Sequence, residues 1–169
     1  MNEPTRAARH CTKCGTILVP REDGERARDA CPREGCGFVL YENPTPVVAA
    51  IVQRGDDVIL VRAKSFPEKW FGLVTGFLEL DERPEDGIVR EVKEELGLDA
   101  TSPTLVGVYP FFPMKQIIIA YHLLVLGDVT LGDELADYKA VPISKVRPWP
   151  FGTGEALTAW LASLGGPTA

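Results

Sequence analysis

The sequence predicts an α+β domain with a mixed sheet, preceded by a small module that carries all the cysteines. Short apolar, β-branched runs mix with helical patterns without a regular strand-helix-strand alternation. All four cysteines fall in the first quarter of the chain. The length of 169 residues leaves room for one medium domain and a small appendage. We therefore expect a first domain at residues 1–42 and a second at residues 43–169.

Composition and charge exclude several classes of protein. The net charge of −6 argues against nonspecific binding to nucleic acid, which needs a basic surface. No apolar run approaches the ~18 residues that span a membrane, and residues 1–6 lack the apolar core of a secretory signal. The hydrophobic content of 45% is typical of a globular protein. We expect a cytoplasmic protein that does not contact membranes.

The cysteines form two short pairs, Cys11-x2-Cys14 and Cys31-x4-Cys36. Two tight turns that each carry two thiolates can complete a tetrahedron around one zinc ion. Two disulfides or free thiols are the alternative, and a reducing cytosol disfavours disulfides. We expect the four cysteines to hold a structural zinc that allows residues 10–40 to fold as a zinc ribbon.

The elements between the cysteines and the middle of the chain read as strands. Residues 41–46 form a Pro-rich connector. Residues 47–52 and 58–61 are apolar, β-branched runs on either side of a turn at 54–57, which indicates a hairpin. A polar loop follows, and residues 70–75 are predicted to be a further strand.

A helix is predicted to begin at Pro84, because proline is favoured in the first turn of a helix. Glu85 and Asp86 follow it, where acidic groups complement the helix dipole. Gly97 is the expected C-terminal stop. One side of this helix is apolar and should pack on a sheet, through Ile88, Val89, Val92 and Leu96.

The remaining elements are two strands, a loop and a helix. Residues 105–109 and 117–125 are predicted strands, and the second is so apolar that we expect it to be buried on both faces. Residues 131–138 read as an acidic loop. Residues 147–152 form a rigid connector before a final helix at 156–164.

Three carboxylates of the predicted helix lie at positions where they repel one another. Glu91, Glu94 and Glu95 stand at i, i+3 and i+4, so they project from one side of the helix. Like charges at this spacing cost a few tenths of a kcal/mol for each pair. A divalent cation would turn the repulsion into attraction, and hard oxygen ligands suit Mg²⁺ or Mn²⁺.

The segment around these carboxylates matches the Nudix box, G-x5-E-x7-R-E-U-x-E-E-x-G-U with U apolar, at every fixed position. The residues at these positions are Gly76, Glu82, Arg90, Glu91, Val92, Glu94, Glu95, Gly97 and Leu98. The chain therefore resembles Nudix hydrolases. The resemblance implies an α/β/α sandwich around a mixed sheet. It also implies Mg²⁺-dependent hydrolysis of a nucleoside diphosphate that is linked to another moiety.

The resemblance also implies a role for each polar residue of the box. The implied metal ligands are the side chains of Glu91, Glu94 and Glu95 and the backbone carbonyl of Gly76. Arg90 lies next to them and is expected to orient a glutamate through a charge-assisted hydrogen bond. Glu82 is expected to be structural and paired with Arg90.

Residues outside the box are candidates for the general base and for substrate contacts. In this superfamily the base is a box glutamate or an acid from a later loop, and among Asp133, Glu134 and Asp137 we choose Glu134. Trp70, Phe77 and Tyr109 are candidates to stack on a base, with burial in the core as the alternative. The substrate contacts that we select are Arg62 to a phosphate, Phe77 to a base, and Gln116 to a base or ribose.

The arrangement of a zinc ribbon before a Nudix domain is similar to that of the NADH pyrophosphatase family and of zinc-ribbon pyrophosphatases that cleave ADP-ribose or FAD. The resemblance favours NADH, cleaved to AMP and a mononucleotide, with ADP-ribose or FAD as the alternative and oxidised nucleoside triphosphates or capped RNA after them. Residues 148–151, Pro-Trp-Pro-Phe, match part of a motif that NADH pyrophosphatases carry soon after the box. Here they lie far past the box, so we expect them to anchor the C-terminal helix.

One further departure from the family's sequence forms bears on specificity, and one alternative concerns the class of function. Residues 70–76, Trp-Phe-Gly-Leu-Val-Thr-Gly, depart from the commoner W-x-L-P-G-G form that precedes the box. A different class of function is a zinc-ribbon binding module joined to a ligand-sensing Nudix domain. The intact carboxylates argue against it, because a sensor does not need them. Homodimers are common among relatives, so we expect one.

Overall fold

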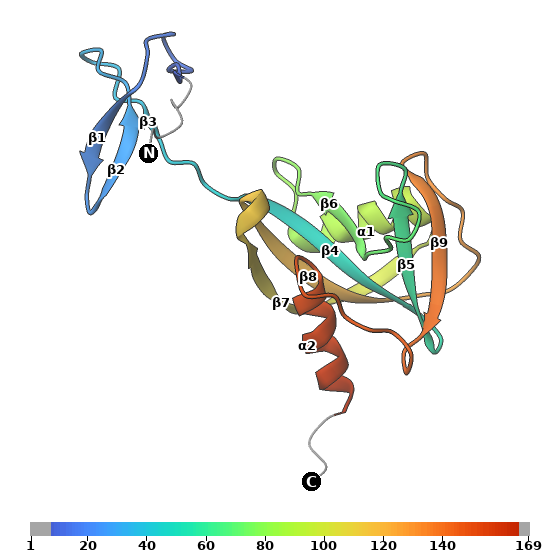
Figure 1. The fold of residues 1–169 in the computed structure, drawn as a ribbon. Coiled ribbons are helices and arrows are strands. Elements are labelled where there is room, and N and C mark those ends of the chain that lie inside the picture. The colour runs from blue at the N-terminus through green and yellow to red at the C-terminus, as the bar shows by residue number, and fades with distance from the viewer. Residues whose placement is uncertain (1–7, 166–169) are drawn as a thin grey trace. The chain divides into compact units, whose positions relative to one another are not determined.

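The computed structural model describes residues 8–165 (Figure 1). Contacts between Cα atoms divide the chain into two compact units, with the division between Asn43 and Pro44. Each unit has a hydrophobic core of its own.

The N-terminal unit is a small antiparallel sheet with the cysteines at one end. Its strands are β1 (Val19–Asp23), β2 (Arg26–Ala30) and β3 (Val39–Leu40), in the order β1-β2-β3. Its core is small, because the cluster of buried residues consists of Cys11, Leu18 and Cys31. A short sheet over so small a core is marginally stable in water unless a further cross-link holds it.

The second unit is built on a mixed six-stranded sheet. Its strands are β4 (Thr45–Arg54), β5 (Asp57–Ala63), β6 (Val74–Phe77), β7 (Ala100–Phe111), β8 (Gln116–Val125) and β9 (Leu135–Pro142). They follow the order β7-β8-β4-β5-β9, and β6 pairs with one end of β4. β4 and β8 run parallel, whereas the other pairs are antiparallel. The predicted α+β class with a mixed sheet is confirmed.

Two helices cover opposite faces of this sheet. They are α1 (Pro84–Leu96) and α2 (Gly154–Leu164) (Figure 1). Because successive side chains of a strand point to opposite faces, Val48 of β4 joins the core that contains α1, and its neighbour Ala49 joins a core that contains α2. The second unit is therefore the α/β/α sandwich that the resemblance implied. Neither helix of the described residues is long and apolar enough to cross a membrane.

The ends of α1 and the first hairpin agree with the sequence analysis. α1 begins at Pro84, and Gly97 ends it in the left-handed conformation with φ 69°, where a glycine is favoured because it has no Cβ. Arg83 precedes the helix without a side-chain cap hydrogen bond. β4 and β5 form the predicted hairpin.

Several predicted elements differ from the structure. β6 begins only at Val74, although residues 70–75 were expected to be a strand. Residues 131–138 are not all loop, because β9 begins at Leu135. β9 is an edge strand with one neighbour, so most of its side chains are exposed and its polar sequence resembles that of a loop. Leu124 is exposed, so β8 is not buried on both faces throughout.

Candidate active site and cysteine cluster

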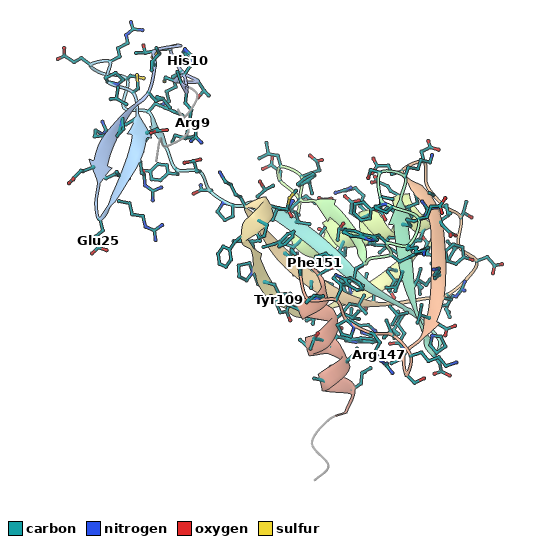
Figure 2. The ribbon with its side chains drawn as sticks, viewed as in Figure 1. Arg9, His10, Glu25, Tyr109, Arg147 and Phe151 are labelled. Atoms are coloured by element: carbon teal, nitrogen blue, oxygen red, sulfur yellow. The ribbon has the colours of Figure 1, made fainter. Side chains whose placement is uncertain are left out.

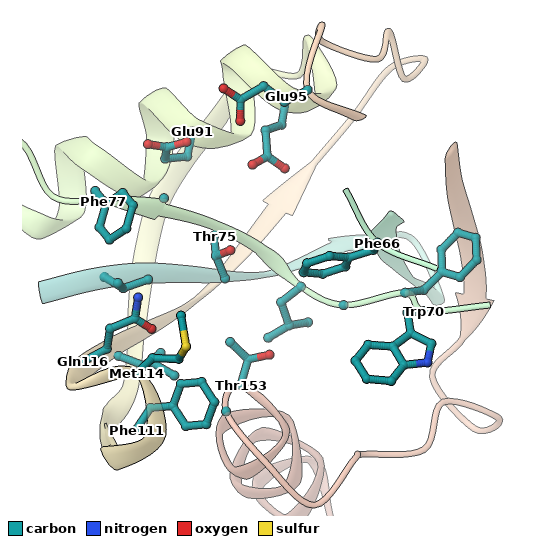
Figure 3. Close-up of a pocket in the computed structure, with 18 of the residues that line it drawn as sticks. Phe66, Trp70, Thr75, Phe77, Glu91, Glu95, Phe111, Met114, Gln116 and Thr153 are labelled. Atoms are coloured by element: carbon teal, nitrogen blue, oxygen red, sulfur yellow. The ribbon is translucent and has the colours of Figure 1, made fainter. Parts of the chain in front are cut away.

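A cavity of about 1020 Å³ lies in the second unit, and α1 supplies one of its walls (Figure 3). Ligand pockets usually measure about 300–1,000 Å³, so the volume is sufficient for a nucleotide. Its lining includes most of the residues that the sequence analysis selected, namely Gly76, Phe77, Arg90, Glu91, Glu94, Glu95, Gln116 and Glu134. Arg62 is an exception, and its expected contact with a phosphate has to be corrected. It lies within β5 opposite Asp137 of β9, and it does not line the cavity.

The glutamates of α1 face the cavity because another side of the helix is buried. Ile88, Val92 and Leu96 are fully buried against the sheet. Residues three and four apart share one face of a helix. The same packing therefore presents Glu91, Glu94 and Glu95 together, and Figure 3 shows Glu91 and Glu95 on the α1 side of the cavity.

Gly76 lies against the carboxylate of Glu91. It belongs to β6 and pairs with Val48 of β4, which places the backbone of β6 beside α1. A Cβ atom at position 76 would overlap the Glu91 carboxylate. Only glycine permits this approach, so the backbone at the start of the box lies next to the Glu91 carboxylate.

Arg90 holds the carboxylates in place. Its Nε and Nη2 donate to the two carboxylate oxygens of Glu82, at 2.8 and 3.0 Å. Its Nη1 donates to Glu91 at 2.7 Å and to Glu94 at 3.0 Å. The hydrogen bonds from Arg90 lower the pKa of Glu82 to about 2. Glu82 does not line the cavity, so it fixes the guanidinium from behind while Glu91 and Glu94 remain accessible.

Glu95 carries a buried oxygen without a partner. Its Oε2 is buried and accepts no hydrogen bond from any residue that the structure describes. Burial, followed by the charges of Glu91, Glu134 and Glu94, raises the pKa of Glu95 to about 8. Burial also raises the pKa of Glu91. An oxygen left unsatisfied among converging carboxylates is costly in the protein alone. Converging carboxylate oxygens are the donor set that a hard dication requires, so the residues fit Mg²⁺ or Mn²⁺.

The sequence of the second unit matches a known family. The model of the NUDIX domain family matches residues 43–160. The chain belongs to the Nudix family. The sequence-based expectation of a Nudix hydrolase is thereby confirmed at the level of the family.

The chain is also similar to individual proteins in sequence and in structure. A protein of Pseudomonas aeruginosa named NAD-capped RNA hydrolase NudC is 30% identical over 144 residues, which is 84% of this chain and 50% of the relative. The chain thus spans about half the length of the curated relatives it matches. A NUDIX hydrolase from Nitrosomonas europaea has a similar structure, with a TM-score of 0.78, 23% identity and coverage of 94% and 93% of the two chains. An ADP-ribose pyrophosphatase from Streptococcus suis has a TM-score of 0.61 at 21% identity, covering 74% of this chain and 95% of its own. The structural likenesses show the fold alone.

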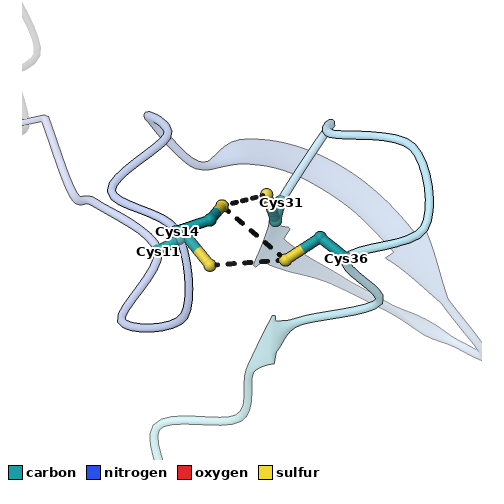
Figure 4. Close-up of side chains that lie close together, drawn as sticks. All are labelled: Cys11, Cys14, Cys31 and Cys36. Carbon is teal, nitrogen blue, oxygen red and sulfur yellow. Dashed lines mark hydrogen bonds between the residues drawn. The ribbon is translucent and has the colours of Figure 1, made fainter.

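The four cysteines before the Nudix domain converge on one point (Figure 4). Their Sγ atoms lie within 4.8 Å of one another, and all four thiols are free. The Cys14–Cys31 distance is 3.5 Å, and the distances from Cys36 to Cys11 and to Cys14 are both 3.7 Å. Four sulfurs at about 2.3 Å from a tetrahedral zinc would be about 3.8 Å apart. The cluster therefore fits a zinc ion, and it contains no disulfide.

The pKa values of the thiols also favour a cation. Hydrogen bonds with Thr16 lower the pKa of Cys14 to about 6. Burial raises the pKa of Cys31 to about 12. Burial disfavours the thiolate of Cys31, and a bound cation would favour it.

Several residues that line the cavity were not among the selected site residues. Phe66 and Thr153 line it, and so do Phe111 and Met114 from residues 111–116, an apolar segment that the sequence offers as the lining of a substrate pocket or as a dimer surface. They come from the loop between β5 and β6, from the end of β7 and the turn after it, and from the start of α2, so no local pattern could have brought them together. Trp149 and Phe151 were expected to anchor the C-terminal helix. Trp149 does pack against the cluster that contains α2, but both residues also line the cavity.

Glu95→Gln is expected to stabilise the metal-free Nudix domain at alkaline pH. The folded pKa of about 8 is raised above the ordinary value of 4.5. The wild-type protein therefore loses stability as the pH rises from about 4.5 through 8, because over this range the unfolded state releases the Glu95 proton while the folded state still holds it. Glu95 is only partly buried, so we discount the full shift to about 1–2 kcal/mol. This corresponds to about 2–8 °C in Tm.

Thermal unfolding in EDTA at pH 4 and pH 8.5 measures this effect. The variant and the wild type should unfold at the same temperature at pH 4, and the variant should be more stable at pH 8.5. Equal Tm values at pH 8.5 would show that ionisation of Glu95 does not destabilise the folded domain.

Proposed function

We propose that this protein is a Mg²⁺-dependent pyrophosphohydrolase that cleaves the diphosphate of a nucleoside diphosphate-linked substrate. One observation carries the proposal. Glu91, Glu94, Glu95 and Glu134 converge on a cavity of about 1020 Å³ whose other lining is largely aromatic and apolar. One part of this cavity suits a cation with a diphosphate, and the rest suits the organic groups on either side of it.

The residues that would hold the metal are the three glutamates of α1, joined by the backbone carbonyl of Gly76. When bound, Mg²⁺ or Mn²⁺ supplies Lewis acidity toward the phosphoryl oxygens and neutralises charge. Arg90 orients Glu91 and Glu94 through the hydrogen bonds described above. Glu134 is the proposed general base, and its charge already acts on Glu91 and Glu95. It accepts a proton from water while the water oxygen bonds to phosphorus and the bridging oxygen leaves.

NADH is the proposed substrate, with AMP and a mononucleotide as products. The relatives named NAD-capped RNA hydrolases support a substrate that contains a dinucleotide diphosphate. Phe77 and Gln116 line the cavity, where they are available to a base or a ribose. ADP-ribose or FAD remains the alternative substrate. A homodimer and a cytoplasmic location remain predictions.

The N-terminal cysteines are proposed to hold a structural zinc ion. Four sulfur ligands close the coordination sphere and leave no position for substrate. The ion would therefore fold residues 1–42 rather than take part in hydrolysis, and residues 43–169 would be the catalytic domain.

Product analysis tests the proposed function. The full chain is incubated with Mg²⁺ and with NADH, FAD or ADP-ribose, and the products are separated by chromatography. We expect AMP from NADH, with a mononucleotide in equal amount, and no AMP when EDTA replaces Mg²⁺. Binding of these compounds without release of AMP would refute the enzyme and favour the ligand-sensing alternative.

A further inference from the structure

The segment between β8 and β9, residues 126–134, carries the proposed general base (Figure 1). Glu134 is its last residue, and it lines the cavity together with Gly132 and Asp133. The segment contains no helix or strand. The position of Glu134 therefore depends on the contacts that hold the segment in place.

The segment is hydrogen-bonded to the C-terminal end of α1. The last four carbonyl groups of a helix have no partner within that helix. The amide of Thr130 donates to the carbonyl of Leu96, and the amide of Gly132 donates to the carbonyl of Glu95, both at 2.9 Å. Glu95 is one of the proposed metal ligands. Its backbone is therefore linked directly to a residue that stands two positions before Glu134.

The backbone of Glu134 is also held by β5. The carbonyl of Glu134 accepts a hydrogen bond of 2.9 Å from the amide of Lys64, the residue that follows β5. The amide of Leu135 donates to the carbonyl of Gly132 at 3.2 Å, and the side chain of Leu135 is buried in the core that contains α1. Glu134 is thus fixed between α1 and β5, and a fixed backbone keeps a catalytic group in its productive geometry.

At Gly132 the segment lies directly against the backbone of α1. A Cβ atom at this position would overlap the carbonyl oxygen of Glu94, and it would lie 3.2 Å from the carbonyl carbon of Glu94 and 3.3 Å from the Cα of Glu95. These are backbone atoms, so they cannot rotate away as the end of a side chain can. Gly132 does not have a positive φ. Glycine is therefore needed here for space and not for its conformational freedom.

We propose that Gly132 is a positioning residue, which allows residues 126–134 to dock on α1 and so sets the distance between Glu134 and the glutamates of that helix. The inference rests on the proposed function, in which Glu134 accepts a proton from water. Atoms in contact are about 3.5 Å apart, so any side chain at position 132 must move the segment from α1 by about 1 Å. A displacement of this size at a catalytic group lowers a rate by about 100-fold. Gly132 lies outside the Nudix box.

Steady-state kinetics of a double-variant cycle test the proposal. Gly132→Ala should lower kcat by about 100-fold and change KM by less than about threefold, because the displaced group acts on water and does not hold the substrate. Glu134→Gln should lower kcat by about 10²–10⁴-fold. The double variant should be within about twofold of Glu134→Gln, since a residue that acts through Glu134 then has nothing left to position. A merely structural role would multiply the two losses.

Gly165→Ala is the matched control, because it makes the same change at a glycine that has room for it. A Cβ atom at Gly165 would meet its nearest neighbour at 3.7 Å, and the φ of Gly165 is −82°. Phe151 lines the cavity near the start of α2 (Figure 2), whereas Gly165 follows the other end of this helix, about 16 Å further along. The values of kcat and KM should stay within about twofold of the wild type.

Leu131→Ala is a second variant, which loosens the docked segment without any overlap. Leu131 is partly buried and packs against the core that contains α1. Its truncation should lower kcat by at least about threefold and have no further effect in the Glu134→Gln background. This pair decides if Gly132→Ala does not fold. The proposal is overturned if Gly132→Ala has the kcat of the Gly165→Ala control, or if either variant multiplies the loss caused by Glu134→Gln.

Amide hydrogen exchange in EDTA separates this proposal from the proposed hydrolysis. In the wild type the amides of Lys64, Thr130 and Gly132 should be protected, because each donates to a backbone carbonyl. Gly132→Ala should lower the protection at positions 130 and 132 by at least about tenfold, whereas Gly165→Ala should not. If exchange behaves in this way but the wild type releases no AMP with Mg²⁺, the hydrolysis is refuted and the docking stands. If the wild type releases AMP and Gly132→Ala leaves the exchange unchanged, the positioning role is refuted and the hydrolysis stands.

Discussion

Glu94→Gln is expected to lower kcat/KM by at least about 10³-fold while the protein stays folded. A metal ion that neutralises a phosphoryl group contributes several kcal/mol to the transition state, and each 1.36 kcal/mol is a factor of ten in rate. Glutamine has the same size as glutamate but is a weak ligand for a hard dication. The Glu94 side chain is 59% exposed, so its replacement leaves no buried group without a partner. The Tm should therefore change little.

The kinetic comparison needs a charge-matched control. Glu85 lies in the first turn of the same helix and does not line the cavity. Glu85→Gln removes the same charge from α1, and its kcat/KM should stay within about twofold of the wild type. Stabilisation of the protein by Mg²⁺ together with a nucleotide should persist in Glu85→Gln and disappear in Glu94→Gln. Wild-type activity of Glu94→Gln would exclude this carboxylate as a metal ligand.

The parts of the fold that sequence reasoning predicted are those with a strong local pattern. α1 has a proline at its start, a glycine at its end and an apolar stripe between them, so its bounds could be given to the residue. The β4–β5 hairpin has two apolar runs around a turn. β9 lacks such a pattern, because an edge strand satisfies only one row of hydrogen bonds and exposes most of its side chains.

The same distinction applies to the candidate site. Glu91, Glu94 and Glu95 were predicted to lie together because one helix fixes their relative positions. Arg62 was assigned to a phosphate from its place after an apolar run, whereas the register of β5 and β9 sets it opposite Asp137 and outside the cavity. Trp70 and Phe151, whose ring centroids lie 6.2 Å apart, are brought together only by the path of the chain across the sheet, which no local pattern contains.

Removal of the proposed zinc ion is expected to unfold the N-terminal unit and to leave the Nudix domain folded. Structural zinc contributes about 10–16 kcal/mol to the folding of small domains at neutral pH. The small buried cluster of this unit, which itself includes Cys11 and Cys31, cannot replace that contribution. The core of the Nudix domain contains none of these residues. Zinc content, amide NMR spectra and limited proteolysis of the full chain, before and after chelation, measure both effects.

Single substitutions distinguish a zinc site from a sheet that is stable by itself. Cys31→Ser removes one buried ligand, so the purified protein should contain less than one zinc ion per chain and be cleaved by protease within residues 8–43. His10→Ala is the matched control, because His10 is exposed beside Cys11 and should leave one zinc ion bound. Protection of residues 8–43 in Cys31→Ser would mean that the sheet folds without the metal. In that case the close approach of the four sulfurs would result from β-sheet packing, and the role of the cysteines would have to be sought elsewhere.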